Sequence, residues 1–326
     1  MEQFGAEISN PVSTGGAGNN FECHVQTLFA VLMLAGGVCP CLPNWPASRI
    51  QLQGKHDGYQ TDDVIVFARN PDSGQEAKLL GQIRLSVAIT KKNKKFGKVI
   101  RRALEDFRNP QLFNEKTDAI ALITGPLSAS DNESVRSLRD LAQYAPTAKD
   151  FLGKFELAKF MSETKRQKFR AIRAQLKAAN DGEDLPEDEL WRFMKSFHFL
   201  SYDLEFSSGA TLSLIQSVLA QFGIRDVAGL WGKVNEEVRM CNQNAGTLLW
   251  DNVSEDLRQT FSKRIVSTPA RDERTPPAEQ DSQKQVVERV QGVQADAMVI
   301  AALAGGFNDK KKADLESLNK LVGGDD

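Results

Sequence analysis

The chain has 326 residues, of which 41% are hydrophobic and 26% charged, and its formal net charge is −2. This length allows one large domain or two smaller ones with a sizeable core. A net charge near zero excludes a chain-wide attraction to nucleic acid or membranes, so any such attraction must come from a local patch.

The cysteines and the N-terminal sequence indicate in which cellular compartment the protein is expected. Cys23, Cys39, Cys41 and Cys241 show no disulfide-framework spacing and are expected to be reduced, structural thiols. The N-terminus is polar and glycine-rich, so no signal peptide is expected. The apolar run over 25–35 is too short to span a bilayer. We therefore expect a soluble cytoplasmic protein.

The first predicted element is a buried helix. Residues 1–20 are expected to form a flexible lead, with Asn19 or Asn20 capping a helix over 21–35 that stops at two glycines. The helix is too apolar for a surface position. Glu22 falls in its first predicted turn, where a solvated carboxylate favoured by the helix N-terminus is the plain explanation.

A β-hairpin follows a first strand over 49–53. Residues 64–67 are β-branched or aromatic, residues 70–74 supply turn residues, and residues 79–86 form the second strand. Folding this hairpin places Asp63 opposite Gln82 to Arg84.

Since side chains alternate along a strand, Gln82 and Arg84 share one face, while Ile83 and Leu85 share the other. Asp63 and Gln82 offer oxygen ligands to a hard cation such as Mg²⁺, Arg84 offers a charge for a phosphate, and Glu22 could complete the site. Each residue also has an ordinary explanation as a turn-flanking or edge-strand polar group.

A basic stretch follows the hairpin, and helical periodicity begins within it, over 98–107. Its cations could neutralise DNA phosphates, or they could form an ordinary solvated helix face. The cations are Lys91, Lys92, Lys94, Lys95, Lys98, Arg101 and Arg102. A second basic run lies at 165–177.

The remaining elements complete an α/β core with a large helical region. A continuous apolar run over 118–124 predicts a central, parallel strand reached by a helical crossover. The other predicted elements are helices over 131–145, 148–179, 186–197, 209–222, 225–243 and 253–264, and a strand over 199–206. We expect one domain over 21–265, with its core at 21–125 and 198–206 and helical regions at 130–197 and 209–264. Residues 266–284 are predicted to be a linker and 285–326 a helical tail.

The motifs resemble a nuclease family. Gly15-Gly16-x-Gly18, Phe21-Glu22-x-x-Val25-Gln26, Asp62-Asp63 and Gln82-x-Arg84 together look like the restriction-endonuclease-like PD-(D/E)xK superfamily. The likeness is to double-stranded-DNA nuclease domains at the N-terminus of antiviral STAND NTPases and in cyclic-oligonucleotide-activated antiphage endonucleases. It covers residues 13–125 by motif and extends in general character to about 260.

This resemblance implies a fold, a cofactor and roles for the site residues. The fold is a mixed sheet flanked by helices, with a large helical insertion and a helical C-terminal tail. The cofactor is Mg²⁺, with Mn²⁺ as a substitute. Glu22, Asp63 or Asp62, and Gln82 are the implied metal ligands, and position 84 is the catalytic cation. The family pattern has lysine there, whereas this chain has Arg84, which keeps the charge but cannot give up a proton.

Two functions remain open from the sequence. The first is a metal-dependent double-stranded-DNA endonuclease that acts as an antiviral effector, attenuated by Arg84 if the family lysine helps to place or deprotonate the water. The second is a catalytically silent DNA-binding or assembly module with the same fold. Activity is expected to require homo-oligomerisation. The chain lacks a Walker A sequence, so either it is a fragment of a sensor protein such as a STAND NTPase or a partner supplies its trigger.

Overall fold

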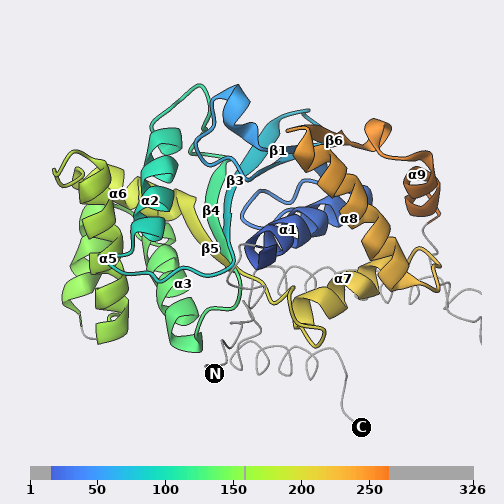
Figure 1. Ribbon diagram of the computed structural model, residues 1–326. Helices are drawn as coiled ribbons and strands as arrows, with labels where there is room; N and C mark the ends of the chain where they lie inside the picture. The colour runs from blue at the N-terminus through green and yellow to red at the C-terminus, as the bar shows by residue number, and fades with distance from the viewer. Residues whose placement is uncertain (1–15, 158, 264–326) are drawn as a thin grey trace, which may run out of the picture.

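The computed structural model describes residues 16–157 and 159–263, and its centre is a mixed open sheet (Figure 1). The strand order is β5-β4-β3-β2-β1-β6. The strands are β1 (Ala47–Leu52), β2 (Val64–Arg69), β3 (Glu76–Arg84), β4 (Ala119–Thr124), β5 (Phe197–Ser201) and β6 (Thr247–Leu249). β6, β1, β2 and β3 pair antiparallel, whereas β3, β4 and β5 run parallel. The predicted α/β class with a mixed sheet is confirmed.

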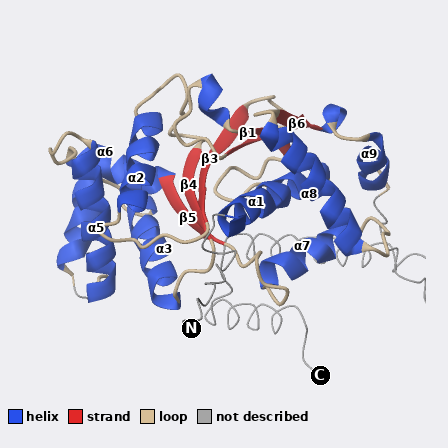
Figure 2. Ribbon diagram, in the orientation of Figure 1, coloured by secondary structure: helices blue, strands red, loops and turns tan. Residues whose placement is uncertain are grey.

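Helices cover both faces of this sheet (Figure 2). One face packs against α1 (Gly16–Leu34), α7 (Ala210–Ala220), α8 (Val227–Gln243) and α9 (Glu255–Phe261). The core on the other face includes α2 (Lys94–Phe107), α3 (Ala129–Gln143), α4 (Ala148–Gly153), α5 (Glu163–Ala179) and α6 (Glu187–Ser196), with α5 packed on α2 and α3 and α4 packed on α6. Strand side chains alternate between the two cores, as period-two alternation requires: Val64 and Val66 join the first, Ile65 and Phe67 the second.

The hairpin of β2 and β3 forms with the predicted register. Val64 pairs with Gly81, so Asp63, one residue earlier, lies opposite Gln82. In the connecting loop, the Asn70 side chain accepts hydrogen bonds from the main-chain nitrogens of Asp72 and Ser73, and Gly74 takes a positive φ of 72°. The loop therefore has the turn chemistry that its sequence predicts.

The predicted crossover to a parallel strand is also confirmed. Asn93 caps α2 by accepting from the main-chain nitrogen of Phe96, and the apolar side of the helix is buried on the sheet. β4 follows, is buried at every position and pairs parallel with β3. This arrangement puts the start of α2 beside the carboxyl end of β3.

Several predicted boundaries are wrong. Helix α1 begins at Gly16, so Asn19 and Asn20 lie inside the helix instead of capping it, and residues 16–20 do not belong to a flexible lead. The predicted helix over 148–179 is broken into α4, a short 3-10 turn (Lys154–Glu156) and α5, because Ser162 caps a new helix start. The strand predicted over 199–206 is β5, which ends at Ser201.

The predicted linker and tail lie outside the described residues, as do residues 1–15. The four cysteines are all described and are free thiols. Within residues 16–157 and 159–263, no helix combines the length and the apolar character needed to cross a bilayer.

Candidate functional site

The carboxylate of Asp63 is the centre of a polar network at the end of the hairpin. Its Oδ2 accepts hydrogen bonds from the main-chain nitrogen of Ile83 at 2.7 Å, from Nη1 of Arg84 at 3.0 Å and from the side-chain amide of Gln82. Asp63 and Gln82 are both buried, Gln82 completely. The structure thus brings together the three predicted hairpin residues.

A further arginine enters this network from α2. Nη1 of Arg102 lies 2.9 Å from Oδ1 of Asp62 and 2.9 Å from Oε1 of Gln82. Arg102 is predicted above only as part of a DNA-binding surface, but its side chain turns toward the site. Asp62 is therefore held by Arg102, while Asp63 is held by Arg84.

Glu22 completes the group from the buried helix α1. Its Oε1 accepts from the side-chain nitrogens of Gln26, at 3.3 Å, and Gln53, at 3.0 Å. The same Gln26 nitrogen donates to the main-chain oxygen of Asp63 at 2.9 Å. Glu22 is the seventh residue of α1, so the explanation as a solvated first-turn carboxylate does not hold.

Burial and neighbouring charges change the acidity of both carboxylates. Burial raises the pKa of Glu22 to about 7, and the neighbouring charge of Asp63 adds to the rise, whereas Arg84 opposes it. Burial also raises the pKa of Asp63, against the opposing effects of Arg84 and of the hydrogen bonds from Ile83 and Gln82. Near neutral pH the site therefore holds a carboxyl group poised to lose a proton.

Three supporting residues were missed by the sequence analysis. Gln26 and Gln53 orient Glu22, as described above. Asp106, on α2, accepts from the main-chain nitrogens of Gln60 at 2.9 Å and Thr61 at 2.6 Å, and so fixes the segment that leads into Asp62 and Asp63. The position of Gln26 within the Phe21-Glu22-x-x-Val25-Gln26 motif was the only sequence signal for any of these residues.

The ligand types of this network match a hard divalent cation, although Gln82 here turns its amide nitrogen toward Asp63 and its oxygen toward Arg102. Glu22 and Asp63 supply carboxylates and Gln82 an amide oxygen, the ligand types that Mg²⁺ takes together with several waters. The buried Oε1 of Gln26 has no hydrogen-bond partner among the described residues. In the described chain, no group of three or more His, Cys, Asp or Glu residues is placed so that it could hold a metal ion.

The two basic runs differ in how their charges are used. Lys91, Lys92, Lys94, Lys95, Lys98 and Arg101 are exposed, and none belongs to an ion pair among the described residues. In the second run, Lys168 pairs with Asp131, Arg170 with Glu163, and Arg173 and Lys177 with Asp184. The first run is thus the more available to an external anion.

Helix α5 also supports the first basic run directly. The side-chain nitrogen of Gln175 donates to the main-chain oxygens of Thr90, Lys91 and Asn93 at 3.1, 2.9 and 3.2 Å. Gln175 is buried, so the loop that carries Lys91 and Lys92 is anchored to the helical region.

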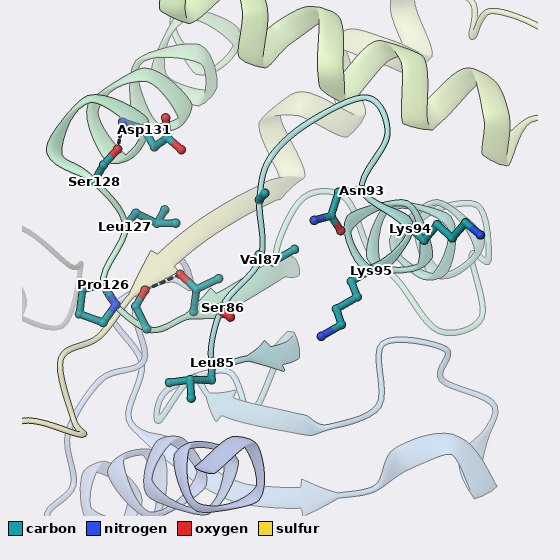
Figure 3. A pocket seen from close by; sticks show the side chains of 13 residues that line it. Leu85, Ser86, Val87, Asn93, Lys94, Lys95, Pro126, Leu127, Ser128 and Asp131 are labelled. Carbon is teal, nitrogen blue, oxygen red and sulfur yellow. Dashed lines mark hydrogen bonds between the residues drawn. The ribbon is translucent and has the colours of Figure 1, made fainter. Parts of the chain in front are cut away.

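A pocket of about 680 Å³ opens next to the network, at the carboxyl ends of β3 and β4 (Figure 3). It is lined by Leu85, which follows Arg84 directly, and by the starts of α2 and α3. Figure 3 shows Lys95 extending from the first turn of α2 on the side of Leu85. Carboxyl ends of parallel strands are a common location for ligands in open α/β sheets.

Comparison with known proteins gives no match to any protein-family model and none among curated proteins. Among solved structures, the chain is similar to the Acinetobacter baumannii Cap4 SAVED/CARF-domain containing receptor with the cyclic trinucleotide 3′3′3′-cAAA. The identity is 12% and the TM-score 0.41, over 74% of this chain and 49% of the receptor chain. The chain therefore spans about half the length of that receptor, and a likeness at this level does not identify its function.

Proposed function

We propose that the chain is a divalent-cation-dependent endonuclease that hydrolyses double-stranded DNA. The observation that carries the proposal is the convergence of Glu22, Asp63 and Gln82, with Arg84, in one connected network. These residues come from α1, from the position just before β2 and from β3; Asp63 and Gln82 are buried, and Glu22 and Arg84 are half-buried. Packing alone gives no reason to gather two carboxylates, an amide and a guanidinium there, since the desolvation of each group is costly.

Each residue has a role that follows from its chemistry. Glu22, Asp63 and the Gln82 amide oxygen would hold the cation, which when bound supplies an activated water and neutralises charge on the phosphate. Arg84 orients the Asp63 carboxylate and presents a positive charge to the phosphate.

The surface beside the network supports DNA as the substrate. The exposed cations of the first basic run follow β3 and continue into α2, next to the pocket at Leu85. Unpaired lysines and arginines of this kind bind phosphates with a strong dependence on salt. The sequence resemblance alone supports three further parts of the proposal: a role as an antiviral effector, activation by oligomerisation, and a trigger from a sensor.

Plasmid cleavage tests the proposal. The purified chain, forced to oligomerise by a fused coiled coil, is incubated with supercoiled plasmid and Mg²⁺ or Mn²⁺. We expect nicking that Asp63→Asn abolishes and that the matched Asp72→Asn variant, at the exposed tip of the hairpin, retains. Absence of nicking, together with absence of Mn²⁺ binding by calorimetry, would falsify the proposal.

One observation favours a second function, the silent DNA-binding module. Arg84 and Arg102 already hold the Asp63, Asp62 and Gln82 atoms that a cation would need. On this alternative, the guanidinium groups replace the cation permanently and the network is structural. The module binds DNA but neither binds Mn²⁺ nor cleaves, whereas cleavage lost in Asp63→Asn rules it out.

A further inference from the structure

Arg84 and Arg102 are each anchored to the network through a single nitrogen. Arg84 uses Nη1 for Oδ2 of Asp63 at 3.0 Å and for the main-chain oxygen of Ile83 at 2.5 Å. Arg102 uses Nη1 for Asp62 and Gln82, both at 2.9 Å. The Gln82 amide donates a hydrogen bond to the Asp63 carboxylate, and the two guanidinium groups lie at opposite ends of this hydrogen-bonded pair.

The other donors of both arginines remain available. No described residue accepts a hydrogen bond from Nε or Nη2 of either side chain, and neither nitrogen is among the buried polar atoms that lack partners. Each side chain is 33% exposed. An arginine has five N–H donors in a planar fork, so each residue keeps an edge that reaches solvent.

Such an edge matches a phosphate group. Guanidinium binds phosphate oxygens through two parallel hydrogen bonds, which gives both charge and geometry. Because Asp62 and Asp63 already fix the two side chains, little rotamer freedom is left to lose on binding. Two fixed guanidinium edges beside one buried carboxylate–amide pair are thus an arrangement prepared for an anion.

Helix α2 carries further cations beside Arg102. Lys95, Lys98 and Arg102 are spaced by three and four residues, which places them along one side of the helix. Lys95 also lines the pocket next to Leu85. A polyanion that contacts Arg102 would therefore meet further cations along the helix, as an isolated phosphate would not.

We propose that Arg84 and Arg102 form a phosphate-binding pair that holds one phosphodiester group of a nucleic-acid strand. The proposal rests on the proposed function only for the identity of the ligand as nucleic acid. Binding through the pair requires neither a divalent cation nor cleavage.

The test is DNA binding in the presence of EDTA, measured by fluorescence anisotropy with a short duplex. We expect Arg102→Gln to lower the affinity by about tenfold and to reduce the slope of log K against log salt by about 1. Arg225→Gln is the matched control. Arg225 is exposed in the segment between α7 and α8, and its substitution removes the same charge as Arg102→Gln does. We expect the DNA affinity of the control variant to stay within about twofold of the unaltered chain, since salt screens a surface charge that lies away from the bound phosphates. Equal losses in the two variants would overturn the proposal.

A second measurement covers the case in which Arg102→Gln fails to fold. An arginine-specific dicarbonyl reagent is applied to the unaltered chain, and the modified residues are identified by mass spectrometry. Duplex DNA is expected to protect Arg84 and Arg102 but not Arg225, and inorganic phosphate at the same phosphate concentration is expected to protect them less. Protection of neither arginine by DNA contradicts the pair, and equal protection by inorganic phosphate contradicts a nucleic-acid strand as its ligand.

The outcomes separate this proposal from the nuclease activity. Loss of affinity in Arg102→Gln without any cleavage by the unaltered chain supports the pair and counts against the enzyme. Cleavage by the unaltered chain with unchanged affinity in a folded Arg102→Gln variant supports the enzyme and refutes the pair.

Discussion

The side-chain nitrogen of Gln26 lies 2.9 Å from the main-chain oxygen of Asp63, and this contact joins helix α1 to the start of β2. The same nitrogen lies 3.3 Å from Oε1 of Glu22. One completely buried amide therefore sets the position of Glu22 relative to Asp63. The site depends on this amide even though Gln26 carries no charge.

Gln26→Met is expected to destabilise the fold. The substitution keeps the volume of the side chain but leaves the buried Asp63 oxygen without its donor, which costs about 1–3 kcal/mol. Chemical denaturation followed by circular dichroism gives the free energy of unfolding. Gln167→Met, on the exposed side of α5, is the control and is expected to change it little. An unchanged denaturation midpoint for Gln26→Met would show that the amide does not join the two elements.

Asp106→Asn is expected to loosen the segment that carries Asp62 and Asp63. The carboxylate accepts from two main-chain nitrogens, and an amide has only one oxygen to offer, so one buried donor loses its partner. We expect a loss of about 1–3 kcal/mol in the free energy of unfolding. Glu105→Gln, on the exposed side of the same helix, is the matched control. If the two variants unfold at the same denaturant concentration, Asp106 does not fix this segment.

The free energy of unfolding is expected to depend on pH through Glu22. The folded-state pKa of about 7 lies above the ordinary value of 4.5. Below the ordinary value, Glu22 is protonated in both states and carries no penalty. As the pH rises from about 4.5 to about 7, the unfolded chain ionises first, and the folded state loses on the order of 3 kcal/mol relative to it.

Glu22→Gln removes this titration. The free energy of unfolding of the variant minus that of the unaltered chain should therefore increase across the same pH range. Denaturation curves at several pH values measure this difference. A difference that stays constant from pH 4 to pH 8 would contradict the raised pKa of Glu22.

Arg84→Lys is expected to raise the cleavage rate by about tenfold or more. Arg84 donates to Oδ2 of Asp63 and to the Ile83 oxygen, and its broad planar head is expected to displace a cation-bound water or to shift the phosphate out of line. A lysine ammonium is compact and flexible, and lysine is the residue at this position in the nuclease pattern that the sequence resembles. DNA affinity should fall, but by less than in Arg102→Gln, because lysine keeps the charge while it loses the planar fork of donors. Single-turnover cleavage and anisotropy measure the two quantities. Equal rates would show that position 84 acts only as a charge.

The hairpin was predictable because its physics is local. The turn residues at 70–74 and the alternation around Gln82 determine the register, and the register places Asp63 opposite Gln82. The start of α1 was not predictable in this way, since Gly16 and Gly18 disfavour a helix that the burial of Phe21 and Val25 nevertheless supports. β6 was missed because three residues carry no periodicity.

The polar partners of the site were harder to predict than the site itself. Arg102 belongs to a run of cations, and only the packing of α2 decides that Arg102 faces Asp62 while Arg101 faces solvent. Gln53 and Asp106 contact residues 31 and 45 positions away, and no local pattern marks such a pair. Sequence reasoning therefore finds the groups expected to carry chemistry more readily than the groups that hold them in place.

The network around Asp63 has a consequence for the order of folding. Its contacts join residues 19 to 40 positions apart, from Asp63–Gln82 to Asp62–Arg102, whereas the link from Gln53 to Asn242 on α8 spans 189 positions. Closing a short loop costs less chain entropy than closing a long one, and contacts of short range form faster. The carboxylates and arginines are thus expected to come together before α8 packs against α1. A nascent chain would therefore hold its anion-binding groups together before the helices on the other face of the sheet have packed.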